Sequence, residues 1–438
     1  MTQPDSKKTR SEALWERALK VIPSGTQTFS KGPGQYVNGV GPKYLRSGKG
    51  GHVWDVDGNE YIDYGMALGP IILGYAHPSV NRAIVEQLGS GITFTLMHPL
   101  EVELAELLAG IIPCAEMVRF GKNGSDAAAG AVRLARAHTK RDKVACCGYH
   151  GWQDWYIGAT SRNLGVPERV GELTFTFQYN DLDSLRSIFT QNPGEVAAVI
   201  LEPANFVEPR NGFLEEVKKL SHCHGALLIF DEIITGFRMA LGGAQEYFRV
   251  TPDLAAFGKA MGNGMPISAL VGRGEVMRLF EEVFFSTTFG GEALSLAASL
   301  ATIREIQTNN VLPHIWRVGR TLLDGYNEAV RAAGLQEATR CIGYPCWPEF
   351  TFAKPDGQPW LEAQTLFMQE IIKRGILTRP GMFVCHAHSD EDIHATVKVF
   401  RQALDIVRDA VQAGEVESRL EGEIVQPVIR SASQAAPR

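Results

Sequence analysis

The 438-residue sequence has few cysteines, no long apolar run and no leader-like start. Its seven cysteines are an odd number without a repeating spacing, which favours reduced thiols over a disulfide framework. No apolar run reaches the length of a membrane span, and the polar start MTQPDSKKTR lacks the apolar segment of a signal peptide. We therefore expect a cytoplasmic protein without a membrane partner.

Blocks of like charge and metal-ligand motifs are also missing. The net charge of −6 at pH 7 is spread along the chain, so the sequence offers no basic surface for nucleic acid. Histidine and cysteine cluster at residues 222–224, and two histidines flank Ala387, but neither cluster belongs to a CxxC or HExxH pattern. We expect no nucleic-acid partner and no metal ion.

Short apolar runs alternate with helical patterns through the middle of the chain, which is typical of an α/β protein with a mostly parallel sheet. The chain is long enough for more than one domain. Near the start, Ser11 and Glu12 favour a helix over residues 11–21, with the serine as its N-cap. The predicted strands of the large sheet cover residues 118–120, 144–147, 197–201, 227–230 and 254–257.

Two of these runs end in charged residues that suggest chemistry. Residues 226–230 end at Asp231, where open α/β sheets bind ligands, and residues 254–257 end at Gly258-Lys259. Desolvation turns a lysine into a usable amine nucleophile. An acid and a lysine on neighbouring strand ends suit pyridoxal phosphate, with Lys259 for a Schiff base and Asp231 for the pyridinium nitrogen. Alternatively, Asp231 caps a following helix and Lys259 pairs with a carboxylate. The spacing alone leaves both interpretations open.

Two further motifs have both a functional and a structural interpretation. Residues 118–130 read as a strand, a glycine turn and a helix, and the N–H groups of Gly124 and Ser125 would make an anion site. An ordinary capped helix would look the same. Tyr149, in the motif GYHGW, follows a predicted strand and suits stacking on a flat ring, although most such aromatics pack in a core.

The segments DEIITGFR and FGKAMGNGMPISALVG resemble the class III, fold-type I aminotransferases, especially the branch that holds glutamate-1-semialdehyde aminomutase. The resemblance extends from about Ile22 to Val411. It implies a large, mostly parallel-sheet α/β domain and a smaller α+β domain built from N- and C-terminal segments. The boundaries that we expect are residues 1–60 for the N-terminal part of the small domain, 61–312 for the large cofactor domain, 313–415 for the C-terminal small domain and 416–438 for a flexible tail.

The resemblance also implies pyridoxal 5'-phosphate as cofactor and a homodimer with shared active sites. The family motif SGTEA reads NGSDA here, which keeps the glycine, the hydroxyl and the acid. The residues assigned in this way are Lys259 for the Schiff base, Asp231 for the ring nitrogen, Gly124 and Ser125 for the phosphate, Tyr149 and Ile233 for the two ring faces, and Thr288 of FSTTFGGE for the phosphate in the other subunit.

The segments expected to meet the substrate depart from the aminomutase pattern. Thr28 and Lys31 stand where the aminomutase has serine and arginine, and Leu68 stands where it has tryptophan. Arg379 and Trp152 are further candidates for substrate contacts, and we expect Trp155 and Tyr156 to line the substrate mouth as well. A lysine lacks the bidentate fork of arginine, so carboxylate recognition would differ.

We therefore expect an aminotransferase that moves nitrogen from a small amino donor, glutamate first, to a carbonyl acceptor. The acceptor would be a keto acid or a keto or aldehyde sugar. The alternatives are the glutamate-1-semialdehyde 2,1-aminomutase reaction or a related intramolecular transfer, another fold-type I activity such as decarboxylation or racemisation, and a non-catalytic binding protein. The presence of Lys259, Asp231 and the phosphate turn disfavours the last of these.

Overall fold

The computed structural model describes residues 9–426, which divide into two compact units. The large unit comprises residues 69–72 and 78–312, and the small unit comprises residues 9–68, 73–77 and 313–426. The small unit therefore combines N- and C-terminal segments, as predicted. The expected domain boundaries at 60, 312 and 415 stay predictions. Between residues 9 and 426, no helix is both long and apolar enough to cross a membrane.

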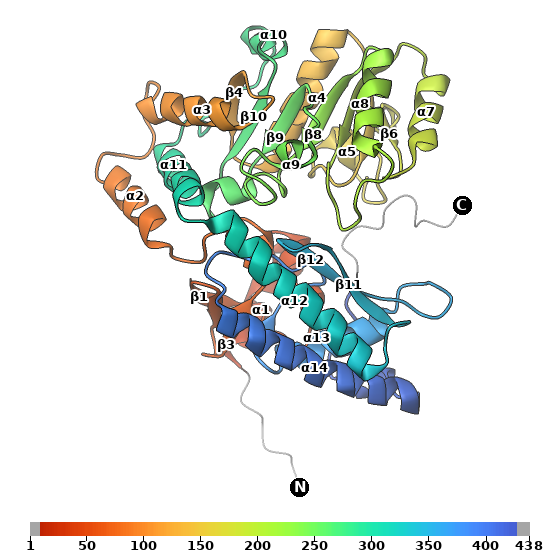
Figure 1. Cartoon of the computed structure of the whole chain (residues 1–438). Helices are drawn as coiled ribbons and strands as arrows, with labels where there is room; N and C mark the ends of the chain where they lie inside the picture. The colour runs from red at the N-terminus through yellow and green to blue at the C-terminus, as the bar shows by residue number, and fades with distance from the viewer. Residues whose placement is uncertain (1–8, 427–438) are drawn as a thin grey trace. The chain divides into compact units, whose positions relative to one another are not determined.

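The large unit is built on a seven-stranded sheet (Figure 1). Strands β6, β5, β7, β8 and β9 run parallel, and β10 lies antiparallel to both β9 and β4. The predicted mostly parallel sheet is confirmed. In spatial order the strands are β4 (Met117–Gly121), β10 (Ser268–Gly272), β9 (Leu254–Phe257), β8 (Leu227–Asp231), β7 (Val196–Leu201), β5 (Lys143–Cys147) and β6 (Thr174–Thr176).

Strands β7, β8 and β9 are buried at every position, which explains their continuous apolar sequences. Small residues of α4, such as Ala128 and Ala131, pack against these strands and form the core of the unit. The helices of the unit are α2 (Pro78–Leu88), α3 (Pro99–Ile111), α4 (Gly124–Thr139), α5 (Asp154–Ile157), α6 (Glu168–Gly171), α7 (Leu182–Gln191), α8 (Phe213–Cys223), α9 (Ala244–Phe248), α10 (Gly274–Met277) and α11 (Ala293–Thr308), with 3-10 turns η5 (Lys259–Gly262) and η6 (Arg278–Glu281).

The small unit contains a four-stranded sheet and a two-stranded sheet (Figure 1). Strands β2 and β3 form a hairpin and pair antiparallel. In β13 the residue Leu377 pairs with Asp63 of β3, and these two strands run parallel. The strands are β1 (Leu45–Lys49), β2 (His52–Asp55), β3 (Glu60–Asp63) and β13 (Ile376–Leu377) in one sheet, and β11 (Thr339–Tyr344) and β12 (Trp347–Phe352) in the other.

Aromatic side chains hold the helices of the small unit against its two-stranded sheet. The Tyr326 ring lies 6.0 Å from Phe350, 5.5 Å from Phe367 and 5.4 Å from Phe400, and all four side chains are fully buried. The helices are α1 (Arg10–Val21), α12 (Val311–Ala333, in this unit from residue 313 on), α13 (Leu361–Ile372) and α14 (Asp390–Ala413), with 3-10 turns η1 (Pro23–Gly25), η2 (Phe29–Lys31), η3 (Pro33–Gln35), η4 (Met66–Leu68) and η7 (Glu417–Arg419).

The predicted helix of residues 11–21 is present, but its predicted cap was wrong. Thr9 caps α1: its hydroxyl accepts a hydrogen bond from the Glu12 N–H at 3.2 Å, and the Glu12 carboxylate accepts one from the Thr9 N–H at 3.1 Å. Ser11 lies inside the first turn instead. Both residue types cap helices, so the composition could not decide between them.

The segment that we expected to begin a flexible tail makes ordered contacts with α13. The Glu421 N–H donates to Gln369 Oε1 at 2.7 Å, and the Val425 N–H donates to Thr365 Oγ1 at 3.1 Å. The Val425 side chain is buried. Both contacts belong to residues 416–426, the described part of the expected tail. Residues 427–438 lie outside the described part of the chain.

Candidate active site

Asp231 is the last residue of β8 and is fixed by two hydrogen bonds. Its Oδ2 atom lies 2.8 Å from Nδ1 of His150, and its Oδ1 atom accepts a hydrogen bond from the Ile233 N–H at 3.2 Å. Both Asp231 and His150 are buried, so water does not compete for the pair. Residues 232–243 form turns and bridges, so Asp231 caps no helix, contrary to the structural alternative considered from the sequence. A buried carboxylate held in this way is preorganised to meet a cationic group.

Lys259 follows the neighbouring strand β9 and begins η5. Its φ angle is +36°, a conformation that costs a non-glycine residue on the order of 1 kcal/mol and that clusters at functional sites. The side chain is half-buried. A Cβ atom on the preceding Gly258 would lie 3.1 Å from Cδ1 of Ile233, so Ile233 packs beside the lysine.

The phosphate turn predicted from the sequence packs against the same region. A Cβ atom on Gly124 would lie 2.9 Å from Cδ1 of Ile233, and one on Gly151 would clash with Oγ of Ser125. Asp126 accepts hydrogen bonds from the N–H groups of Lys122 and Asn123 at 3.0 and 2.8 Å, which holds the turn before α4. Among the described residues, the Gly124 and Ser125 N–H groups have no hydrogen-bond acceptor. They are available to an anion at the positive end of the helix.

Glu202 is a residue of this site that the sequence interpretation missed. Its Oε2 atom accepts a hydrogen bond from the Tyr149 N–H at 3.0 Å. Burial, and then repulsion from Asp231, raise the pKa of Glu202 to about 7, while the charge of Lys259 opposes the shift. These couplings place Asp231 and Lys259 within electrostatic reach of Glu202. Glu202 directly follows the apolar strand β7, as Asp231 follows β8, so the same strand-end rule would have found it.

The aromatic residues after β5 separate into an exposed and a buried group. The Tyr149 side chain is 52% exposed, and its ring meets Tyr156 edge to face at 5.7 Å. The Trp152 side chain is 66% exposed. Trp155 and Tyr156 are instead buried and pack around His150 at 6.1 and 5.4 Å. The expectation that Trp155 and Tyr156 line the substrate mouth was therefore wrong, because they position His150 from within the core.

Thr288 lies in an exposed loop that precedes α11. Phe284 and Phe289 flank it with exposed fractions of 78% and 57%. At the end of the loop, Glu292 caps α11 and also pairs with Lys122 of the phosphate turn at 2.9 Å. The loop that carries Thr288 is thus tied to the turn that carries Gly124 and Ser125.

The remaining predicted substrate residues belong to the small unit. Thr28 and Lys31 lie on either side of Phe29 in the loop that follows α1, and Lys31 is exposed. Arg379 follows β13, and its buried Nε atom has no hydrogen-bond partner among the described residues. Burial raises the pKa of Glu349 to about 7, and the nearby Arg379 charge opposes this shift. Arg379 and Glu349 are therefore neighbours within the small unit.

Comparisons with known proteins agree with this geometry. The sequence matches the family described as Aminotransferase class-III over residues 38–404. A 3-aminobutyryl-CoA aminotransferase from Cloacimonas acidaminovorans is 38% identical over 412 residues, which cover 92% of this chain and 98% of that protein. A glutamate-1-semialdehyde 2,1-aminomutase from Roseiflexus castenholzii is 38% identical over 440 residues, which cover 92% of this chain and 99% of that protein.

Solved structures share the fold over the same extent. The FumI protein of Sphingopyxis sp. MTA144, in its PLP internal aldimine form, superposes with a TM-score of 0.85 at 29% identity and covers 92% of this chain and 98% of its own. An omega-transaminase from Sphaerobacter thermophilus superposes with a TM-score of 0.84 at 26% identity and covers 92% of this chain and 99% of its own.

The residues of the large unit suit pyridoxal 5'-phosphate. The open N–H groups at the start of α4 suit its phosphate, and the buried carboxylate of Asp231 suits a protonated ring nitrogen. Lys259 supplies an amine on the adjacent strand end. The chain belongs to the class-III aminotransferase family and is a fold-type I, pyridoxal phosphate-dependent enzyme.

Proposed function

We propose that this enzyme moves an amino group from an amino acid, glutamate first, to the carbonyl carbon of a keto acid or of a keto or aldehyde sugar. The single observation that carries the proposal is the Asp231–His150 pair at 2.8 Å, at the end of β8, whose neighbour β9 is followed by Lys259. A buried carboxylate that a fixed partner holds at the end of a parallel strand is suited to pair with a cationic ring nitrogen. The departures of the chain from the aminomutase pattern support an intermolecular transfer.

Each residue of the large unit has a distinct task in this proposal. Lys259 would hold the cofactor through its amine. Once released, this amine would take a proton from the donor α-carbon in the first half-reaction and would give a proton to the acceptor carbon in the second. Asp231, held by His150, pairs with the cationic ring nitrogen. When bound, pyridoxal phosphate supplies an electron sink for the bonds at the α-carbon.

The other proposed contacts hold the cofactor in place. Gly124 and Ser125 bind the phosphate through their backbone N–H groups, and the Ser125 hydroxyl adds a donor. Tyr149 stacks on one face of the cofactor ring. The Tyr149 side chain is exposed beside Glu202, so the face of the tyrosine ring is available for this contact. Ile233 covers the other face, which is supported by its packing against Gly124 and Gly258.

We also propose the substrate contacts and the assembly. Thr28, Lys31, Trp152 and Arg379 contact the donor and the acceptor, and Arg379 suits a carboxylate because its Nε atom lacks a partner among the described residues. The enzyme is a cytoplasmic homodimer in which Thr288 reaches the phosphate bound in the second subunit.

Exposed apolar side chains around Thr288 support the dimer. Phe284 and Phe289 lie in its loop, and Leu96 and Met97 are 76% and 81% exposed in the segment that follows α2. The Ala293 N–H donates to the Ile92 carbonyl at 2.8 Å, which joins this segment to the start of α11. An apolar surface of this kind is suited to a second copy of the chain.

A second candidate is the glutamate-1-semialdehyde 2,1-aminomutase reaction, which several relatives at 35% to 38% identity carry in their names. The Cloacimonas relative is named as a 3-aminobutyryl-CoA aminotransferase, so the keto counterpart of 3-aminobutyryl-CoA is a further acceptor to assay. These candidates differ in the partner of the amino group rather than in the roles of Lys259 and Asp231.

The test is to mix purified holoenzyme with excess L-glutamate, record the absorption spectrum and assay 2-oxoglutarate. The proposal predicts loss of the cofactor band together with one equivalent of 2-oxoglutarate per active site. No spectral change and no 2-oxoglutarate would rule out glutamate as donor. Alanine, diamines and glutamate-1-semialdehyde would then be tried in the same assay, and turnover of glutamate-1-semialdehyde alone would establish the aminomutase reaction.

A further inference from the structure

The small unit contains a partly open cavity of about 270 Å³, and among the residues that line it only Lys31 has been given a role above. It lies where β3 and β13 end and where β1 begins, and all of its walls come from this unit. Its apolar walls include Leu45, Leu68 and Leu377. Small-molecule sites are concave and mostly apolar, with a few convergent polar groups, and this volume accommodates one small group or part of a larger substrate.

Two lysines line this cavity without an acidic partner. Lys31 comes from η2, and Lys43 comes from the segment before β1. Within residues 9–426, neither ammonium group lies within ion-pair distance of a carboxylate. The Lys43 N–H donates to Ser11 Oγ at 3.2 Å, so the backbone of this lysine is fixed while its side chain remains available.

Tyr36 adds a third hydrogen-bond donor. Burial, and then the charge of Asp63, raise the pKa of the Tyr36 hydroxyl, so it stays protonated and can donate. Arg379 opposes that shift, which places a further cation near the same hydroxyl. The cavity thus presents two ammonium groups and a neutral phenol, all of which can donate hydrogen bonds.

The one acid of the cavity does not neutralise this set. Asp63 is 3% exposed, and its oxygens accept hydrogen bonds from the Gly65 N–H and the Tyr75 hydroxyl, each at 2.7 Å. Its lone pairs are therefore largely used within the fold. The two ammonium charges outnumber this one carboxylate. The cavity therefore keeps an excess of positive charge, and a phosphate ester, with several acceptor oxygens, offers one to each of the three donors.

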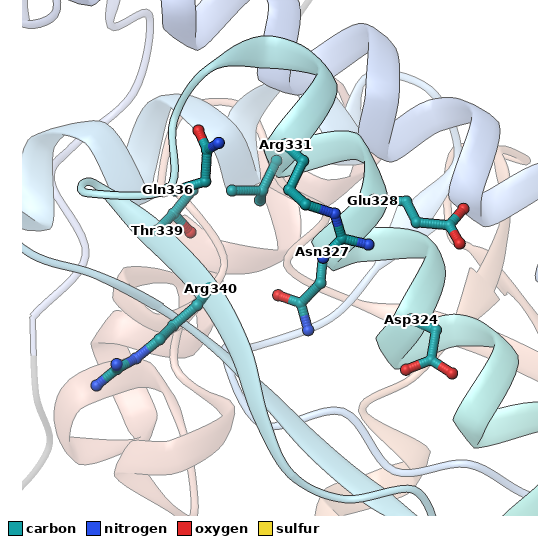
Figure 2. Close-up of a pocket in the computed structure, with 8 residues that line it drawn as sticks. Asp324, Asn327, Glu328, Arg331, Gln336, Thr339 and Arg340 are labelled. Carbon is teal, nitrogen blue, oxygen red and sulfur yellow. The ribbon is translucent and has the colours of Figure 1, made fainter.

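Another hollow of the small unit shows the opposite arrangement. It measures about 340 Å³ and holds Arg331 and Arg340 together with the carboxylates of Asp324 and Glu328. In Figure 2 the two arginines extend from different elements in different directions. Because cations and acids are mixed there, that hollow presents no converging donors to an anion.

The backbone next to the cavity of Lys31 and Lys43 is also unusual. Met66, Ala67 and Leu68 have consecutive φ angles of +42°, +54° and +76°, which non-glycine residues rarely adopt. Such conformations persist where the surrounding structure enforces them, and they cluster at ligand sites. The segment places Ala67 and Leu68 against the cavity.

We propose that Lys31, Lys43 and the Tyr36 hydroxyl bind a phosphate group carried by the carbonyl acceptor, so that the substrate is a phosphate ester. The inference rests on the proposed aminotransferase function and narrows its acceptor. The leucine walls contact the carbon skeleton next to the phosphate, and the phenol and ammonium groups contact its oxygens. Two sources carry this chemistry, namely a phosphorylated sugar and a coenzyme A thioester.

The test measures binding by calorimetry to the holoenzyme, in which the cofactor already fills its own phosphate site. The probes are inorganic phosphate, glucose 6-phosphate and free coenzyme A, and the variants are Lys43→Met, Tyr36→Phe and the control Lys49→Met. Lys49 is an exposed lysine of the same unit that does not line the cavity. Loss of one charge-assisted contact should weaken binding about tenfold or more for Lys43→Met and less for Tyr36→Phe. Lys49→Met should bind like the wild type.

The outcomes separate this inference from the proposed function. Tighter binding of glucose 6-phosphate or of coenzyme A than of inorganic phosphate identifies the source of the phosphate. Equal affinities in the wild type and in both cavity variants would overturn the inference, as would a wild type that binds none of the three probes. The glutamate half-reaction of the wild type tests the proposed function separately, because it needs no acceptor.

Discussion

Replacing His150 by leucine removes the hydrogen-bond partner of Asp231 Oδ2 and keeps an apolar side chain among Trp155 and Tyr156. The lost bond is 2.8 Å long, charge-assisted and fully buried. Bonds of this kind contribute roughly 1.5–3 kcal/mol, which corresponds to about 10- to 150-fold in an equilibrium constant. The Ile233 N–H would still bond the Asp231 carboxylate, but the loss of the His150 contact should weaken pyridoxal phosphate binding by about tenfold or more.

The assay is titration of apoenzyme with pyridoxal phosphate, followed by absorbance, with thermal unfolding recorded in parallel. His222→Leu is the matched control, because His222 also bonds a buried aspartate, Asp253, at 2.8 Å in the same unit. His222 is half-exposed, so its loss should cost less stability, and it should leave cofactor affinity unchanged. Equal weakening of cofactor binding in both variants, or a His150→Leu affinity within about twofold of the wild type, would refute the reasoning.

Three further predictions follow from individual contacts. Gly124→Ala should weaken cofactor binding about tenfold, because the added Cβ would lie 2.9 Å from Ile233. The control Gly110→Ala places its Cβ where no atom lies within 4 Å and should leave cofactor binding unchanged. Equal cofactor affinities of the two variants would contradict the packing argument. Burial raises the pKa of Glu202 from 4.5 to about 7, so the folded chain binds a proton that the unfolded chain releases, and the free energy of unfolding should fall as pH rises between these values. Urea unfolding at a series of pH values should show that the free energy of unfolding falls less steeply with pH in Glu202→Gln than in the wild type. The same pH dependence in both proteins would count against the raised pKa of Glu202. Lys259→Ala should abolish amino transfer and still bind the cofactor reversibly in an absorbance titration, and residual turnover would place the chemistry on another residue.

Much of the large unit was predictable because its central strands are short apolar runs bounded by charge. The expected strand at 254–257 matches β9, and the expected strand at 197–201 differs from β7 by one residue. Burial on both faces removes the alternation that makes other strands ambiguous, so composition and length sufficed. The charged residues at the end of β8 and just after β9 then marked the positions of Asp231 and Lys259.

The contacts between distant segments could not be read in the same way. His150 meets Asp231 across 81 positions of sequence, and the contact depends on how β5, β7 and β8 are ordered in the sheet. Without that order, the density of aromatic residues after β5 did not distinguish a substrate mouth from a core, which is why Trp155 and Tyr156 were misplaced. Glu202 was accessible to the strand-end rule but was not singled out.

The cavity of the small unit could not be foreseen for a related reason. Lys43 and Tyr36 lie in irregular segments without a periodic pattern, and their proximity to Asp63 depends on the hairpin and on the parallel pairing with β13. Only the resemblance to a family drew attention to Lys31. The absence of an acidic partner for Lys31 and Lys43 within residues 9–426 is a property of the fold rather than of the sequence.

The most direct test of the central claim is to reduce the holoenzyme with borohydride, digest it and locate the cofactor by peptide mass spectrometry. The account predicts that the cofactor is fixed on Lys259, in the peptide that follows β9. Attachment at another lysine, such as Lys122 in the turn before α4, or no covalent attachment at all, would contradict it.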